Sequence, residues 1–289
     1  MPNVIPYLLL ILCIVPVLIW LLCHTRQFHT IALYFSFVGM IYIFEFFIIV
    51  ILDAYEYAPG IFPNRYKDNM VGAVVSNFIA VPIIATLIGT LQLRSRWIVI
   101  FACLFGAIEW GFLRLGVYVH HWWTIGYTVV SLLFFFWLTR MWMRQVQAGN
   151  AVLRYVTYFT YVFCLTDTLV FAFILFGLRQ FASGLYDHND RDDVFVTVLY
   201  AFAKAAVIVN ATYWTRKARW ISIGLAMALI LASQIFLIRF GILHVYISYG
   251  LYYSIYVPCC AMVFWLSFRA LHALRHPGRL RLGASVRNS

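Results

Sequence analysis

Nine long apolar runs constrain the fold of this chain more than any other feature of its sequence. Each run has about 20 residues, which is the length that an α-helix needs to cross the hydrocarbon core of a bilayer. The runs do not alternate apolar and polar residues, as the strands of a membrane β-barrel would. Hydrophobic residues make up 64% of the chain, more than a soluble protein of 289 residues buries. We therefore predict an all-α, polytopic integral membrane protein that is surrounded by the lipid bilayer.

The predicted spans leave no room for a soluble domain, because the longest connections have only about 16 residues. The first run is counted as a span, since it has neither a basic n-region nor a small-residue cleavage site. The nine spans cover residues 5–23, 29–52, 70–92, 97–118, 124–143, 153–177, 194–214, 219–238 and 244–270.

The charged residues alternate between successive connections. The formal net charge is +11, and the basic residues collect in every second connection and at the C-terminus. In a soluble protein this charge would suggest a nucleic-acid partner, but here it sets orientation and no nucleic acid is expected. The positive-inside rule places the N-terminus outside and the C-terminus in the cytoplasm, which an odd number of spans also requires. We expect the protein in the cytoplasmic membrane.

Rare polar residues recur after a shift of 125 positions, which aligns Asp68 with Asp193 and Arg114 with Arg239. The shift predicts a parallel internal repeat, a plan that is known in transporters. Duplication without transport is the alternative. The predicted organisation is an extra N-terminal helix (1–28), a first four-helix unit (29–150), a second four-helix unit (151–272) and a basic cytoplasmic tail (273–289).

Charged residues inside the spans are the candidate binding residues. A charge at this depth costs several kcal/mol and normally faces a bundle interior or a wet cavity. Lys204 and Asp167 fall at similar depths on neighbouring antiparallel helices, so we expect them to pair. The pair would either fix helix packing or form a proton- or substrate-linked site near the midplane. The full candidate set is Lys204, Asp167, Glu109, Glu45, Arg114 and Arg239.

Glu109 and Arg114 lie in the same apolar run but are not expected to meet. Five residues separate them, which places them about 140° apart around a helix. Arg114 lies near the outer end, where its side chain can extend to the interface. Glu109 lies deeper, so we expect it to have a buried polar partner elsewhere.

The outer connections carry two further motifs. "HHWW" (His120 to Trp123) is typical of an interfacial aromatic belt. The alternative is that His120 and His121 join Asp53 and Glu56 around an outer-face cleft. "YDHNDRDD" (residues 186–193) is expected to be a solvated acidic loop, because a calcium loop would also need a turn glycine and a distant glutamate. No metal or cofactor motif is present, and we expect neither a metal nor a cofactor.

The segments "IEWGFLRLGVYVHHWWTIGYT" (residues 108–128) and "YAPGIFPN" (57–64) resemble stretches of small multi-pass membrane proteins of endospore-forming Firmicutes. The likeness covers roughly residues 30–145. It implies a bacterial, all-helical membrane protein and no assigned activity. The second unit departs from the pattern, because Gln234 stands where the first unit has Glu109.

The repeat and the buried charges favour a transporter-like protein for a small solute, an ion or a lipid. A membrane-embedded enzyme that acts on a lipid-like substrate at the outer face is one alternative. A non-catalytic sensory or assembly subunit is the other. No catalytic residue is identified from the sequence.

Overall fold

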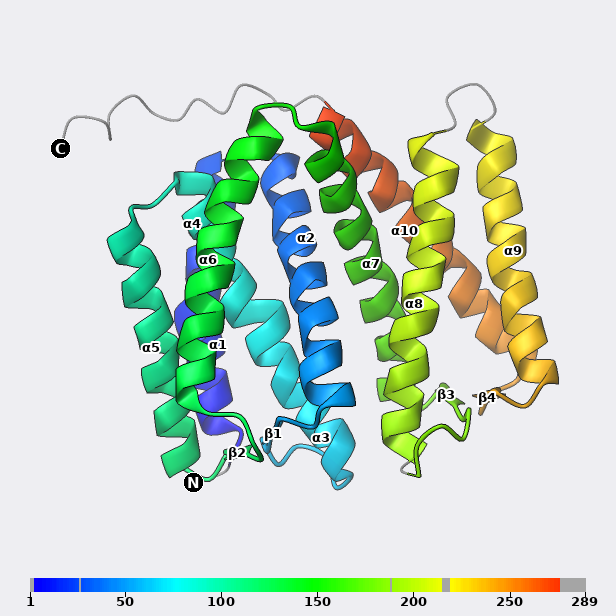
Figure 1. The fold of residues 1–289 in the computed structure, drawn as a ribbon. Helices are drawn as coiled ribbons and strands as arrows, with labels where there is room; N and C mark the ends of the chain where they lie inside the picture. Colours follow the sequence, from blue (N-terminus) through cyan, green and yellow to red (C-terminus); the bar gives the residue numbers. More distant parts are fainter. Residues whose placement is uncertain (1–2, 26, 188, 215–218, 276–289) are drawn as a thin grey trace.

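Long helices run roughly side by side in the computed structural model, which describes residues 3–25, 27–187, 189–214 and 219–275 (Figure 1). Within these ranges nine helices are long and apolar enough to cross a membrane. The prediction of an all-α, multi-pass membrane protein is confirmed at this level. The chain begins at the lower end of Figure 1, and its last described helix ends at the upper end. Most of the predicted basic tail lies outside the described residues.

Seven of the nine spans are single α-helices, and two contain a π-helical segment. The second span is α2 (Phe28–Glu45) followed by the π-helix η1 (Phe46–Ile51), and the third is α3 (Arg65–Val74), η2 (Val75–Ala80) and α4 (Val81–Leu91). The others are α1 (Ile5–Thr25), α5 (Ser95–Arg114), α6 (Ile125–Gln147), α7 (Ala151–Leu175), α8 (Asn189–Tyr213), α9 (Arg219–Arg239) and α10 (Tyr249–Arg275).

Polar first turns explain why two helices begin earlier than the predicted spans. α3 begins at Arg65 rather than at 70, because the Asn64 side chain accepts a hydrogen bond from the Lys67 backbone N–H and caps the helix. α8 begins at Asn189 rather than at 194, and its first turn carries acidic residues that suit a helix N-terminus. Hydropathy alone excludes such turns from a span.

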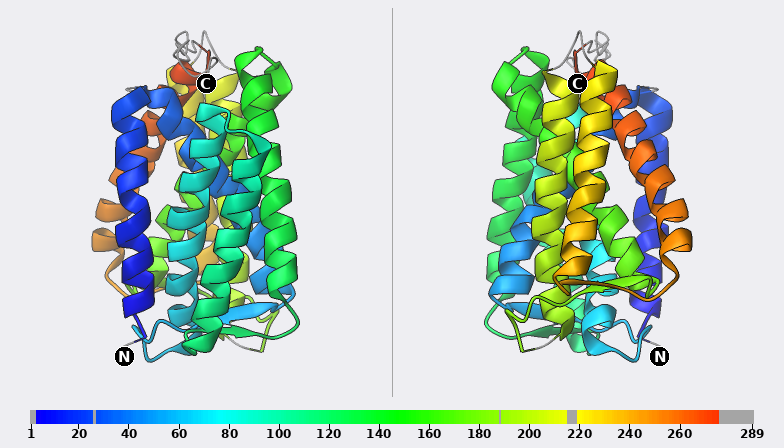
Figure 2. Two further views of the ribbon diagram at one scale, coloured as in Figure 1. Left: turned by 90° about the vertical axis from the view of Figure 1, so that its left-hand side faces the viewer. Right: turned by 90° about the vertical axis from the view of Figure 1, so that its right-hand side faces the viewer.

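Two short antiparallel ribbons lie at the lower end of the bundle, and the sequence did not predict them (Figures 1 and 2). β1 (Tyr55–Tyr57) pairs with β2 (Tyr118–His120), and β3 (Arg179–Phe181) pairs with β4 (Leu243–Val245). The first ribbon joins the connection after the second span to the connection after the fourth span. The second ribbon joins the connections after the sixth and eighth spans in the same way. Strands of three residues are too short for an alternating pattern to identify.

The loops beside the two ribbons are held by matching hydrogen bonds. Asp68 accepts hydrogen bonds from the backbone N–H groups of Gly60 and Ile61, and Asp192 accepts them from Gly184 and Leu185. The bonds span eight and seven residues in both loops. Asp68 thus corresponds to Asp192 and not to the residue after it, so the shift is 124 residues in this part of the chain.

The acidic stretch of residues 186–193 is not a solvated loop, and this expectation is wrong, because α8 begins within the stretch at Asn189. Asp192 and Asp193 are each only 2% exposed. Asp193 accepts a hydrogen bond from the Phe181 N–H at 2.8 Å, and Asp192 accepts one from the Ser183 hydroxyl at 2.7 Å. Their carboxylates are buried because they replace the missing backbone partners of the turn that follows β3.

The two halves of the chain meet along α2 and α7, which run in the same direction in Figure 1. The Ser36 and Thr160 hydroxyls hydrogen-bond across this seam at 2.7 Å, and both side chains are buried. Gly39 lies beside them, and a Cβ there would overlap the Thr160 carbonyl oxygen. Small and hydroxylated residues at such a contact are typical of close helix packing in membranes.

Gly39→Ala is therefore expected to lower the stability of the folded protein by about 1–3 kcal/mol, because the added methyl group forces α2 and α7 apart. Thermal unfolding of the purified protein in detergent measures this change. Gly111→Ala is the matched control, since a Cβ at Gly111 meets nothing within 4 Å. Equal melting temperatures for the two variants would contradict close packing at the seam.

Candidate functional site

The first unit encloses a cavity of about 350 Å³ in the lower half of the bundle. Side chains from α2, η2, α5, α6 and the β1–β2 ribbon line it, and α1 closes one side. Most of the wall is apolar or aromatic. Two carboxylates, those of Glu45 and Glu109, interrupt this wall.

Glu45 ends α2, at the junction with the π-helix η1. The Tyr55 hydroxyl donates to this carboxylate, 2.8 Å from one oxygen and 2.6 Å from the other. Burial raises the pKa of Tyr55 well above its ordinary value, so the phenol keeps the proton that it donates. The Asn77 amide in η2 lies against the same carboxylate. π-helical segments often mark functional sites.

Glu109 has the polar partner that was expected from the sequence, and this partner is His120 of the β1–β2 ribbon. Glu109 is 8% exposed, and its carboxylate lies 2.6 Å from Nε2 of His120. Arg114 is exposed at the end of the same helix, with its guanidinium 5.4 Å from the Trp110 ring centroid. The two charges of this run are thus apart, as helix geometry predicts. The sequence assigned His120 only to an aromatic belt or to an outer cleft.

A smaller cavity of about 80 Å³ lies beside the first, where the two halves of the chain meet. Glu45 and Asn77 line both cavities, whereas Asp167 of α7 and Thr197 of α8 line only the smaller one. One carboxylate oxygen of Asp167 and the hydroxyl of Thr197 have no hydrogen-bond partner in the described part of the chain. The structure thus brings Asp167 together with Glu45, although these residues are distant in the sequence.

Lys204 does not pair with Asp167, and this prediction is wrong. Within the described ranges no salt bridge joins them, and the Lys204 Nζ has no hydrogen-bond partner. The ammonium instead lies 4.9 Å from the ring centroid of Tyr256 and 5.6 Å from that of Tyr200. The helices are adjacent as expected, but Asp167 faces α2 and Lys204 faces α10.

A second buried cation, Arg179, belongs to the β3–β4 ribbon and was missed by sequence reasoning. Arg179 is 1% exposed and donates to the Tyr252 hydroxyl at 3.2 Å. Its guanidinium lies 5.7 Å and 5.1 Å from the ring centroids of Phe173 and Phe181. An arginine in a connection between apolar runs normally lies at an interface, so the sequence carried no signal for its burial.

Arg239 is exposed at the end of α9, as Arg114 is at the end of α5. Neither residue lines a cavity described above. The candidate site therefore consists of Glu45, Glu109 and Asp167, with Lys204 in a separate aromatic cluster of the second unit.

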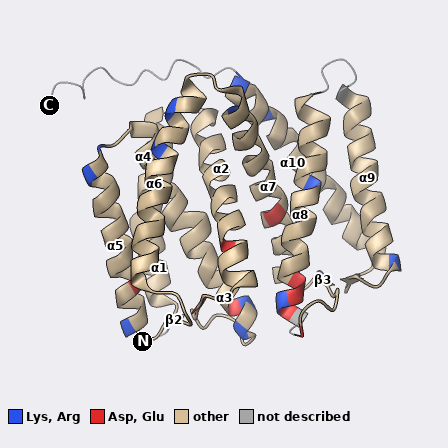
Figure 3. Cartoon of the chain, viewed as in Figure 1, with Lys and Arg blue, Asp and Glu red and all other residues tan. Residues whose placement is uncertain are grey.

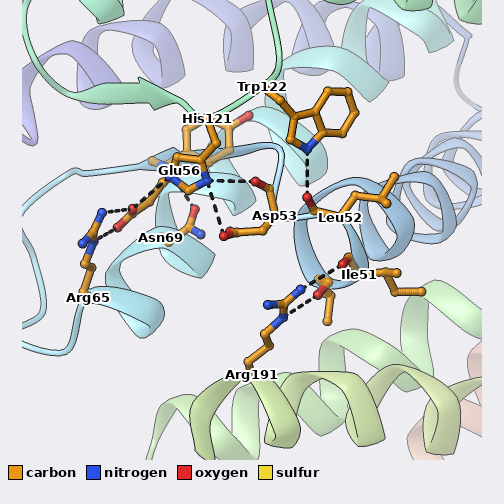
Figure 4. A network of polar contacts seen from close by, with 11 residues as sticks. Ile51, Leu52, Asp53, Glu56, Arg65, Asn69, His121, Trp122 and Arg191 are labelled. Carbon is orange, nitrogen blue, oxygen red and sulfur yellow. Dashed lines mark hydrogen bonds and ion pairs between the residues drawn. The ribbon is translucent and has the colours of Figure 1, made fainter. Parts of the chain in front are cut away.

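The connections at the lower end of the first unit form a polar network at its surface (Figure 4). His121 Nδ1 lies 2.8 Å from the Asp53 carbonyl oxygen and 3.5 Å from its carboxylate. Glu56 binds Arg65 through two contacts of 2.5 Å. Among the described residues no group of three or more His, Cys, Asp or Glu side chains is arranged to hold a metal ion. His121 also lies 4.0 Å from the Glu56 carboxylate. Of the four residues considered from the sequence, the structure thus brings His121, Asp53 and Glu56 together, whereas His120 faces Glu109.

Comparisons of this chain with protein-family models, curated proteins and solved structures find no match. The geometry of the two cavities is therefore the main indication of function.

Removing the Tyr55 hydroxyl is expected to destabilise the protein by about 1.5–3 kcal/mol, because the Glu45 carboxylate loses its donor. Tyr55→Phe tests this in thermal unfolding experiments. Tyr127→Phe is the matched control, since Tyr127 is half exposed. In the Glu45→Gln background the cost of Tyr55→Phe should shrink, as in a double-mutant cycle for interacting residues. An unchanged cost would argue against the Tyr55–Glu45 bond.

Proposed function

We propose that this chain is a transporter-like membrane protein whose first unit binds a small organic cation. The observation that carries the proposal is the pair of carboxylates, Glu45 and Glu109, on the wall of an otherwise apolar cavity. Its volume of about 350 Å³ lies in the range of small-molecule sites. Aromatic rings in the wall, including Trp123 and Tyr118, suit a cation because their faces attract positive charge.

We further infer that the two four-helix units arose by duplication. The matching hydrogen bonds beside the two ribbons support this reading, as do the ribbon registers. Tyr55 lies opposite His120 in one ribbon, and Arg179 lies opposite Val245 in the other. A parallel repeat is a plan that transporters use. The shift is 124 residues at Asp68 and 125 residues at Glu109, so the second unit has one more residue between the corresponding Asp192 and Gln234.

The second unit suggests which ligand the first unit takes. The residues that correspond to Tyr55 and Glu109 of the cavity wall are Arg179 and Gln234. Arg179 reaches Gln234 through the Tyr252 hydroxyl, which lies 2.9 Å from the Gln234 oxygen. The protein's own guanidinium thus lies among aromatic rings at this place in the second unit. The first unit has no such arginine and carries carboxylates instead, which favours a ligand with a guanidinium or ammonium group.

The distribution of charge supports the orientation expected from the sequence. In Figure 3 the described connections at the upper end carry basic residues and no acidic ones, whereas the lower end carries both, and further acidic residues lie on α2 and α7. By the positive-inside rule the upper end is cytoplasmic, and the cavity lies in the outer half. The resemblance to Firmicutes proteins would make this a bacterial cytoplasmic membrane, and it stays a prediction.

Cationic probes are expected to stabilise the purified protein more than neutral molecules of the same shape. Methylguanidinium should raise the melting temperature, and methylurea should not. Choline should raise the melting temperature more than its neutral analogue 3,3-dimethylbutan-1-ol does. Glu109→Gln should weaken the response to the cations at least about tenfold, because a charge-assisted contact contributes about 1.5–3 kcal/mol. Asp187→Asn, which removes an exposed acid outside the cavity, is the matched control and should respond normally.

Equal stabilisation by the charged and neutral members of each pair would overturn the assignment of a cationic ligand. A normal response of Glu109→Gln would overturn the assignment of the site.

Uptake of labelled methylguanidinium into proteoliposomes tests transport itself. We expect wild-type uptake, and we expect Lys204→Ala and Asp167→Asn to abolish it while the protein stays folded. The Lys204 Nζ and one Asp167 carboxylate oxygen are buried without a hydrogen-bond partner in the described part of the chain, and buried charges in membrane helices normally serve ion or substrate pathways. Normal uptake in both variants would remove them from the pathway. Binding without uptake in the wild type would identify a sensory subunit instead.

A further inference from the structure

The smaller cavity holds a buried carboxylate that lacks a positive partner. Asp167 is 9% exposed, and in the described part of the chain it forms no ion pair. A charged group inside a membrane protein costs several kcal/mol unless a partner compensates it. Lys204, the base that the sequence predicts as the partner of Asp167, contacts aromatic rings instead. Asp167 therefore requires either a proton or a bound cation.

The other polar groups of the cavity are oxygen donors suited to a small hard cation. The Thr197 hydroxyl has no hydrogen-bond partner in the described part of the chain, although the residue is only 1% exposed. Asn77, Glu45 and Tyr42 also line the cavity. Carboxylate, carbonyl and hydroxyl oxygens are the ligands that such ions prefer. A proton would neutralise the Asp167 carboxylate, whereas a cation would neutralise it and also bind the Thr197 hydroxyl oxygen.

Size and charge narrow the choice of ion. The volume of about 80 Å³ is enough for one ion with one or two water molecules, each of which takes about 30 Å³. It is too small for the organic cation proposed for the larger cavity. A divalent ion normally draws on more acidic ligands, and the described residues include no group of three His, Cys, Asp or Glu side chains that would hold one.

We propose that the cavity between the two units is a sodium-ion site formed by Asp167, Thr197, Asn77 and Glu45. Two of these residues also line the larger cavity, so the two sites share one carboxylate. Each bound cation draws on the same negative charge, and binding of one weakens binding of the other. Such mutual weakening of binding is expected of a transporter that exchanges one cation for the other. This last step rests on the proposed function, whereas the sodium site itself does not.

The helix geometry around the shared residues supports a coupled pair of sites. The π-helix η1 begins directly after Glu45, and η2 contains Asn77. The corresponding helices α7 and α8 carry no π-helical segment. π-helical turns are rare and occur mostly at functional positions.

Thermal unfolding of the full-length protein in NaCl and in KCl at equal ionic strength tests the site. Sodium is expected to raise the melting temperature of the wild type over potassium. Asp167→Asn and Thr197→Val should both lose this difference. Thr139→Val is the matched control, because Thr139 is buried in α6 and its hydroxyl bonds the Phe136 carbonyl oxygen of the same helix. This variant should keep the sodium response.

Two further measurements separate the outcomes. Equilibrium binding of ²²Na⁺ to the wild type should saturate near one ion per chain. Unlabelled Na⁺ should compete with the label, and K⁺ should not. Because this measurement uses only the wild type, it tests the site even if a variant fails to fold. Glu109→Gln, which alters only the larger cavity, should lose the methylguanidinium response and keep the sodium response. Sodium should also weaken methylguanidinium binding to the wild type.

Identical melting in the two salts, with no saturable ²²Na⁺ binding, would overturn the sodium site, and stabilisation by acid alone would identify a proton on Asp167. Retention of the sodium response in both Asp167→Asn and Thr197→Val would place any bound ion elsewhere. If sodium binds but methylguanidinium does not, the sodium site stands and the proposed organic cation fails.

Discussion

The close contact between α2 and α7 is the interaction on which the rest of the structure depends. Inside a membrane, apolar side chains gain little by leaving lipid for another helix, so helices associate through tight packing and hydrogen bonds. Gly39 permits that approach, and the bond between Ser36 and Thr160 crosses it. Because α2 ends at Glu45 and α7 carries Asp167 on the same seam, the packing also brings two carboxylates to one cavity.

The two units handle buried charge in opposite ways. The first unit keeps carboxylates beside a cavity and stabilises them with hydrogen bonds from a tyrosine and a histidine. The second unit carries Arg179 and Gln234 where the first unit has Tyr55 and Glu109, and the Arg179 charge lies against aromatic rings. Cation–π contacts compensate only part of the cost of burying a charge. The two units therefore differ in charge at these matching places, and only the first has a carboxylate there.

The sequence predicts the helical framework well because bilayer thickness fixes the length of an apolar run, and every span has its helix. It also predicts that Glu109 and Arg114 do not meet, since five residues set their angle on any helix. Tertiary packing determines which residues the buried charges contact, and equal depth in the membrane does not predict which of them pair. Lys204 and Asp167 share a depth and lie on adjacent helices, yet their side chains point to different neighbours. The two ribbons could not be predicted, because the only sequence features that mark their loops are the single aspartates that accept the loop hydrogen bonds.

The shared position of Glu45 links the architecture to a mechanism. Glu45 carries a single negative charge, and that charge can fully compensate only one bound cation. Two cavities that share this carboxylate therefore cannot both bind a cation at full affinity. Tyr55 and Asn77 bind this carboxylate from the ribbon side and from the η2 side. A change of occupancy in one cavity therefore alters the hydrogen bonds that shape the other. The π-helix η1 begins directly after Glu45 and η2 contains Asn77, so both residues lie at the kind of helical irregularity that is frequent at functional sites.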